Sequence, residues 1–148
     1  MMFQDILVPT DGSDFSNKAV STAARLAHSL HAKLLVLHVR SPIESPHHVE
    51  GGALTQLGGN VVMQEIEDEE RKLLDAALEI AAANGTTAKT AFVAGYSTYD
   101  AIIRIAREQH CDLIVMASHG RRGLSGFLIG SETQKVLTHT SIPVLVVR

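Results

Sequence analysis

The sequence predicts an α/β fold: a doubly wound five-stranded parallel sheet with strand order 3-2-1-4-5 and helices on both faces. Five short apolar segments alternate with stretches in which apolar residues recur every three or four positions. Strands that alternate with helices form parallel sheets, because each parallel pair needs a crossover connection. The predicted strands are residues 3–8, 33–39, 88–93, 112–117 and 143–147.

Three of these strands contain continuous apolar runs, at 34–37, 113–116 and 144–147. A strand is apolar at every position when both faces of its sheet are covered. The runs therefore predict helices on both faces of the sheet.

The first helix is predicted to follow Ser13, because a serine hydroxyl caps a helix N-terminus well. Its apolar residues share one face and are expected to point inward: Phe15, Ala19, Ala23, Leu26, Ala27 and Leu30. A second apolar stripe runs from Val62 to Ile80, and Asn84-Gly85 is expected to end that helix.

Two serines begin patterns that resemble capping boxes, in which a side chain three residues later completes the cap. Ser97 with Asp100 is predicted to open a third helix, and Ser131 with Gln134 a fourth. In the third helix, Ile102 and its neighbours face inward.

The composition is that of a single globular domain, residues 1–148, with 45% hydrophobic and 20% charged residues. A net charge of −3 without a like-charged tail makes nucleic acid an unexpected partner. No apolar run approaches the ~18 residues of a membrane span, so membrane insertion is not expected. The single cysteine, Cys111, is expected to be a buried thiol in a reducing compartment, which places the protein in the cytoplasm.

Residues 40–60 are rich in proline and glycine and too long for an ordinary connection, so weak order is expected there. His47, His48 and Glu50 fall in this segment. Without a ligand-spacing pattern they are interpreted as solvated side chains, and no metal site is predicted.

Ligands of open α/β sheets bind beyond the carboxyl ends of the strands, where the strand order reverses. In the predicted order, the reversal lies between the first and fourth strands. The first strand is followed by Pro9-Thr10-Asp11-Gly12-Ser13 and the fourth leads into His119-Gly120. Farther on, Gly130-Ser131 begins a predicted helix, whose N-terminus favours an anion such as phosphate. The alternative from spacing alone is that the glycines only shape a surface loop.

These segments, in this order along the whole chain, resemble the universal stress protein family. Its ATP-binding branch carries the pattern G-x2-G-x9-G-[S/T], and here Ala117 stands at the first glycine while Gly120 and Gly130-Ser131 keep the spacing. By this resemblance, adenine would be met by Asp11 and Val39 beside Pro9 and Thr10. The resemblance assigns the ribose and phosphates to Met116, Ala117, His119, Gly120, Gly130, Ser131, Glu132 and Thr133. Arg121 and Arg122 are expected to face solvent, and His38 to be a hydrogen-bonded core residue.

The resemblance implies an ATP, ADP or AMP cofactor, with any Mg²⁺ carried by the nucleotide, and a regulatory role in stress or starvation through assembly or an unidentified protein partner. It also implies a homodimer through the exposed edge of the last strand, comprising Pro143, Val144, Leu145, Val146 and Val147. No catalytic residue is predicted, because neither a Walker lysine nor a nucleophile elbow is present. Two alternatives stay open: a dimerisation module that binds no nucleotide, and a weak ATPase or self-phosphorylating protein.

Overall fold

The computed structural model describes residues 2–41, 68–94, 97–120 and 128–148. The strands are β1 (Asp5–Pro9), β2 (Lys33–Arg40), β3 (Ala88–Ala94), β4 (Leu113–Ala117) and β5 (Val144–Val147). The helices are α1 (Asp14–Leu30), α2 (Asp68–Ala83), α3 (Thr98–Glu108) and α4 (Ser131–His139). Each predicted strand is present, with ends that differ from the predicted ones by at most two residues. The expectations for residues 42–60, including His47, His48 and Glu50, for the helix start near Val62, and for Arg121 and Arg122 lie outside the described residues.

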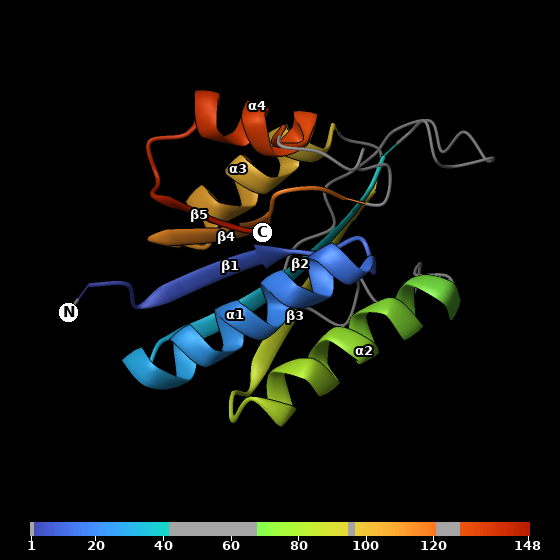
Figure 1. Cartoon of the computed structure of the whole chain (residues 1–148), viewed down its shortest axis with the longest axis vertical. Coiled ribbons are helices and arrows are strands. Elements are labelled where there is room, and N and C mark those ends of the chain that lie inside the picture. Colours follow the sequence, from blue (N-terminus) through green and yellow to red (C-terminus); the bar gives the residue numbers. More distant parts are fainter. Residues whose placement is uncertain (1, 42–67, 95–96, 121–127) are drawn as a thin grey trace.

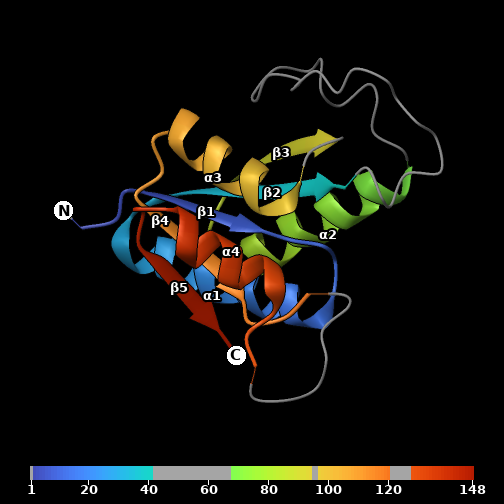
Figure 2. The same ribbon diagram turned by 90° about the horizontal axis from the view of Figure 1, so that it is seen from above.

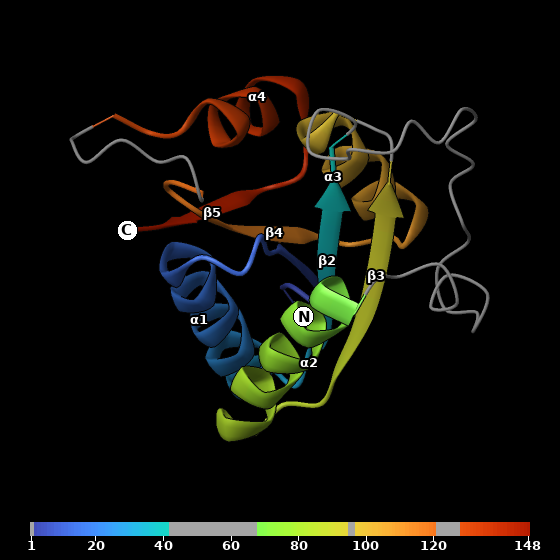
Figure 3. The ribbon, with the colours of Figure 1, turned by 90° about the vertical axis from the view of Figure 1, so that its right-hand side faces the viewer.

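The strand order β3-β2-β1-β4-β5 confirms the predicted fold class. Every neighbouring pair is parallel, and β1 is central: Leu7 lies opposite Leu35 of β2 and Ile114 of β4. The chain first builds the sheet outward from β1 to β3 and then returns to place β4 on the other side of β1 (Figures 2 and 3).

Helices cover both faces of the sheet, with α1 and α2 on one side and α3 and α4 on the other (Figure 1). Alternate residues of each strand point to opposite sides. In β4, Val115 packs in the cluster that contains α1 residues, whereas Ile114 and Met116 pack in the cluster that contains α3 residues. This double coverage is why the central strands are apolar at every position.

Helix α1 is capped as predicted, since the Ser16 amide donates to the Ser13 hydroxyl at 3.2 Å. Ser97 occupies the N-cap position of α3, as predicted, but the predicted capping bond is absent, because its side chain makes no hydrogen bond to the first turn. The predicted cap of α4 is wrong. Gly130 occupies the N-cap position, and the Gln134 side chain donates to the carbonyl of Ile129.

The prediction for one α1 residue is corrected as well. Phe15 is 39% exposed and does not face the core. It belongs to the first turn of α1, beyond the end of β1, where its ring lies 5.6 Å from that of His119. Ala19, Ala23 and Ala27 do form the buried face.

None of the helices in the described part of the chain has the length and apolar character needed to cross a membrane. Cys111 is buried, as predicted, just before β4. Burial, together with the negative charges of Asp5 and Asp112, raises the pKa of its thiol from 9.0 to about 11.

The raised pKa predicts that the Cys111 thiol reacts slowly with alkylating reagents. Near pH 8 the thiolate fraction of Cys111 should be about a hundredth of that of a cysteine with an ordinary pKa, so iodoacetamide should modify native protein at least that much more slowly than urea-unfolded protein. The unfolded chain also releases the thiol proton near pH 9, before the folded one does. The free energy of unfolding should therefore fall between pH 9 and 11 more steeply in the parent than in Cys111→Ala. Equal alkylation of folded and unfolded protein would contradict the buried thiol.

Candidate functional site

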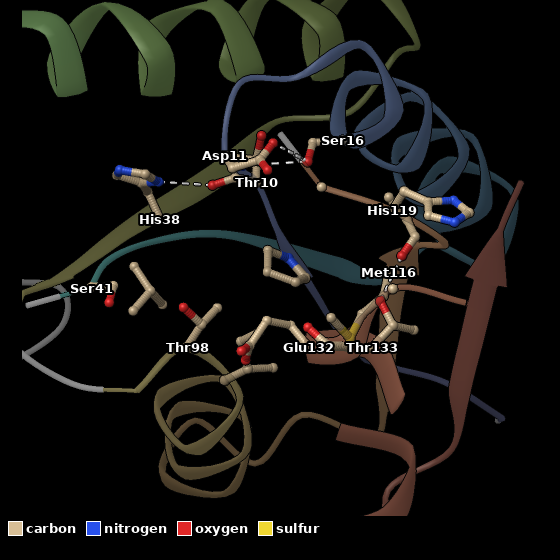
Figure 4. A pocket seen from close by; sticks show the side chains of 17 residues that line it. Thr10, Asp11, Ser16, His38, Ser41, Thr98, Met116, His119, Glu132 and Thr133 are labelled. Atoms are coloured by element: carbon tan, nitrogen blue, oxygen red, sulfur yellow. Dashed lines mark hydrogen bonds between the residues drawn. The ribbon is translucent and has the colours of Figure 1, made fainter. Parts of the chain in front are cut away.

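A cavity of about 340 Å³ opens at the point where the strand order reverses, beyond the carboxyl ends of β1 and β4. We call it the β1–β4 cavity. Its volume lies within the range of small-molecule sites. In Figure 4, Thr10, Asp11 and Ser16 lie along one side of it, and Thr98, Glu132 and Thr133 lie along the opposite side.

The cavity brings together all twelve residues that the sequence assigned to a nucleotide: Pro9, Thr10, Asp11, Val39, Met116, Ala117, His119, Gly120, Gly130, Ser131, Glu132 and Thr133. Five further lining residues were missed: Ser16, His38, Ser41, Thr98 and Ile102. Two of them had a usable signal, because Ser41 follows β2 and Thr98 follows β3, and the carboxyl ends of parallel strands share one edge of the sheet.

Asp11 is fixed by the turn that joins β1 to α1. Its Oδ1 atom accepts hydrogen bonds from the Ser13 amide at 2.9 Å and from the Ser16 hydroxyl at 2.7 Å. Gly12 adopts a φ of +80°, which a residue without a side chain reaches at no steric cost. The carboxylate is thus held at one wall of the cavity by the same residues that begin α1.

The opposite wall is the first turn of α4, which is fastened to the end of β4. The Gly130 amide donates to the carbonyl of Ser118 at 2.6 Å, and the Thr133 hydroxyl donates to the carbonyl of Ala117 at 2.8 Å. The Thr133 hydroxyl was expected to reach a phosphate, but its proton is committed to this backbone contact.

Gly130 occupies the N-cap position of α4 and has no side chain, so no capping side chain from the described residues occupies the amides of the first turn, which lies at the cavity wall. The acidic residue in that turn, Glu132, is directed to a neighbouring helix: its Oε2 atom accepts from the Tyr99 amide of α3 at 3.0 Å. This bond replaces the missing cap of Ser97. The arrangement leaves one of the helix N-termini around the cavity open to a ligand.

Strand β2 contributes His38 and Val39 to the cavity. His38 is buried, as predicted, and its Nδ1 atom donates to the carbonyl of Thr10 at 2.8 Å. Its ring also lies 5.9 Å from that of Phe92. The hydrogen bond fixes the Thr10 backbone immediately before Asp11.

Two glycines of the pattern lie so close to other parts of the chain that a side chain there would make tight contacts. A Cβ atom on Gly130 would lie 3.0 Å from the carbonyl oxygen of Ser118, and one on Gly120 would lie 2.7 Å from Oδ2 of Asp11. Ala117, which replaces the first glycine of the pattern, packs in the cluster on the α1 side. Its methyl group is therefore accommodated in the core.

Among the described residues, no group of three or more His, Cys, Asp or Glu side chains could hold a metal ion. The predicted interface strand β5 lies at the edge of the sheet. In that strand, Leu145 is 40% exposed.

Comparisons with known proteins agree with this architecture. A sequence model of the universal stress protein family matches residues 2–148. Universal stress protein YxiE of Bacillus subtilis is 35% identical over 149 residues, covering 99% of this chain and 100% of the relative. Among solved structures, a universal stress protein in complex with cAMP is 28% identical with a TM-score of 0.72, covering 100% of this chain and 98% of that one. UspA from Lactobacillus plantarum is 26% identical with a TM-score of 0.77, covering 100% and 99%.

The two motif glycines should respond differently to substitution without any ligand. In Gly130→Ala the new methyl group meets backbone, which must move, so the free energy of unfolding should fall by about 1–3 kcal/mol. In Gly120→Ala the methyl group meets only Oδ2 at the end of the Asp11 side chain, which can tilt while Oδ1 keeps its bonds to Ser13 and Ser16, so the loss should stay below about 1 kcal/mol. Urea unfolding of both variants measures the difference. A Gly130→Ala protein as stable as the parent would contradict the tight fastening of α4 to β4.

Proposed function

Because the chain belongs to the universal stress protein family, we propose that it binds an adenine nucleotide in the β1–β4 cavity and acts as a regulator. The observation that carries this proposal is the uncapped first turn of α4, which faces Asp11 across a nucleotide-sized cavity. The nucleotide is ATP, ADP or AMP, and any Mg²⁺ is carried by its phosphates. No catalytic residue is part of the proposal.

The phosphate end of the nucleotide lies at the start of α4. Backbone amides and the helix dipole at an open N-terminus favour an anion. Gly130 and Ser131 provide the open turn, and Gly120 contributes backbone from the facing segment. The related structure that was solved with cAMP supports a phosphate-bearing adenine ligand.

The base end lies at the β1 and β2 side. Val39 and Ile102 provide apolar surface for a purine ring, and Asp11 provides an acceptor for an amino or hydroxyl group. The carboxylate is held by Ser13 and Ser16, so it is oriented before the ligand arrives. Preorganisation of this kind reduces the ordering cost of binding.

The proposed regulatory role combines nucleotide binding with assembly of the protein. We propose a homodimer through β5 that presents its nucleotide state to a protein partner in the cytoplasm during stress or starvation. The partly exposed Val144–Val147 strand supports the interface, because an apolar strand at a sheet edge is usually covered or paired.

Nucleotide binding can be tested by replacing one residue. Proline is accepted at the first position of a helix, and Gly130 has a ψ of 151°, a conformation compatible with a following proline. Ser131→Pro should therefore keep α4 while it removes one amide donor and one hydroxyl. We expect calorimetry to show at least about tenfold weaker binding of ATP and AMP, since hydrogen bonds to charged groups contribute roughly 1.5–3 kcal/mol.

Two controls separate the loss of the amide from the loss of the hydroxyl, and the loss of phosphate binding from the loss of base binding. Ser131→Ala removes only the hydroxyl, so a smaller loss is expected, and adenosine, which lacks phosphate, should bind parent and Ser131→Pro equally. In the parent, a nucleotide at 100 times its Kd should add about 2.7 kcal/mol to the free energy of unfolding. If ATP, AMP and cAMP at millimolar concentration neither bind nor stabilise the parent protein, nucleotide binding is wrong and the dimerisation-module alternative is favoured.

The dimer is tested by a matched pair of exposed leucines. Leu145 of β5 is 40% exposed and Leu137 of α4 is 42% exposed. Leu145→Lys should convert a dimer into a monomer in light scattering, because it places a charge in the apolar edge, whereas Leu137→Lys should leave the mass unchanged. A parent protein that is already monomeric at high concentration would overturn this interface.

A further inference from the structure

Glu132 occupies an unexpected place for an acidic residue. It is the second residue of α4 and lines the β1–β4 cavity between Ser131 and Thr133. An acidic side chain in a first turn stabilises the helix through the dipole. The same turn is the anion site of the proposed function, so Glu132 and a phosphate compete for the same positive end of the helix.

The carboxylate is held at the cavity wall by two partners. Oε2 accepts from the Tyr99 amide at 3.0 Å, and Oε1 lies 3.2 Å from the Lys135 ammonium. The Lys135 ammonium also lies 5.6 Å from the centre of the Tyr99 ring. The ion pair is roughly half exposed, at 48% for Lys135 and 41% for Glu132, so water screens the contribution of the lysine. The anchored carboxylate therefore remains a negative charge beside the phosphate position.

We propose that Glu132 makes the β1–β4 cavity select nucleotides by phosphate charge, favouring a single phosphate over a metal-free triphosphate. This inference rests on the proposed nucleotide site. Each added phosphate brings further negative charge next to the Glu132 carboxylate, and these like charges repel by an amount that water and salt reduce, because the carboxylate is partly exposed. One phosphate can bind the α4 amides, whereas a triphosphate adds further charges around the same carboxylate.

The test compares the ratio of the Kd values for AMP and ATP, measured by calorimetry in EDTA at low salt. Glu132→Gln removes the charge and keeps an oxygen that can accept from the Tyr99 amide. Glu132→Ala removes both the charge and the cap of α3. Glu108→Gln removes an equal charge at the far end of α3, where Glu108 pairs with Arg104, and controls for net charge.

Both Glu132 variants should improve ATP binding relative to AMP by about threefold to tenfold, and the gain should shrink as salt rises. Glu108→Gln should leave the ratio unchanged. Glu132→Ala should lower the melting temperature more than Glu132→Gln, because both lose the helix-dipole interaction and the Lys135 ion pair but only Glu132→Ala loses the α3 cap.

Three outcomes would overturn the inference. An unchanged ratio in both Glu132 variants would show that its charge does not act on the ligand. A change confined to Glu132→Ala would show that Glu132 acts by holding α3. If the parent binds AMP and ATP but already prefers metal-free ATP, the selection by charge is wrong while the proposed function stands; if the parent binds neither, the proposed function fails first.

Discussion

The pairing of β1 with strands on both of its sides is the constraint on which the site depends. β1 pairs with β2 through a connection that carries α1 on one face, and with β4, from which the chain continues to α4 on the other face. Helices that leave two neighbouring parallel strands in opposite directions diverge, and the space between their first turns cannot be filled by either helix. Leu7, fully buried between Leu35 and Ile114, lies at the centre of this arrangement.

The walls of that space are held by backbone carbonyl groups that the sheet does not use. Thr10 offers its carbonyl to His38, while Ala117 and Ser118 offer theirs to Thr133 and Gly130. Within the described residues, no buried side-chain nitrogen or oxygen lacks a hydrogen-bond partner. Fully partnered polar groups resist rearrangement, because each broken bond leaves a buried group unsatisfied. The cavity is therefore shaped by the scaffold and does not need a ligand to define it.

The strands and their order were predictable because they follow from patterns that act over short distances: continuous apolar runs, helical spacing and the crossover rule. Strand ends and a helix start also indicated the segments 9–13, 119–120 and 130–131 as the ligand site. The full set of twelve lining residues, with Val39, Met116 and Glu132 among them, came from the resemblance to the universal stress protein family. The helix caps were not. Ser97 had the correct local pattern, yet Glu132, more than thirty positions away, took the Tyr99 amide. Similarly, periodicity placed Phe15 inside, but the first turn of α1 extends past the sheet. In both cases the outcome depends on groups that are distant in the sequence, and the spacing of residues along the chain does not specify such contacts.

The hydrogen bonds that hold the start of α4 also limit the length of the edge strands β4 and β5. Ala117 and Ser118 direct their carbonyl oxygens to the start of α4, so the chain leaves the sheet at that point and β4 cannot continue. β5, which pairs with β4 along its four residues, is confined to the same short length. A strand this short offers few backbone bonds to a second chain, so any assembly through it must derive its strength from side chains. The exposed side chains of this edge, Leu145 above all, would then decide which surface the strand accepts.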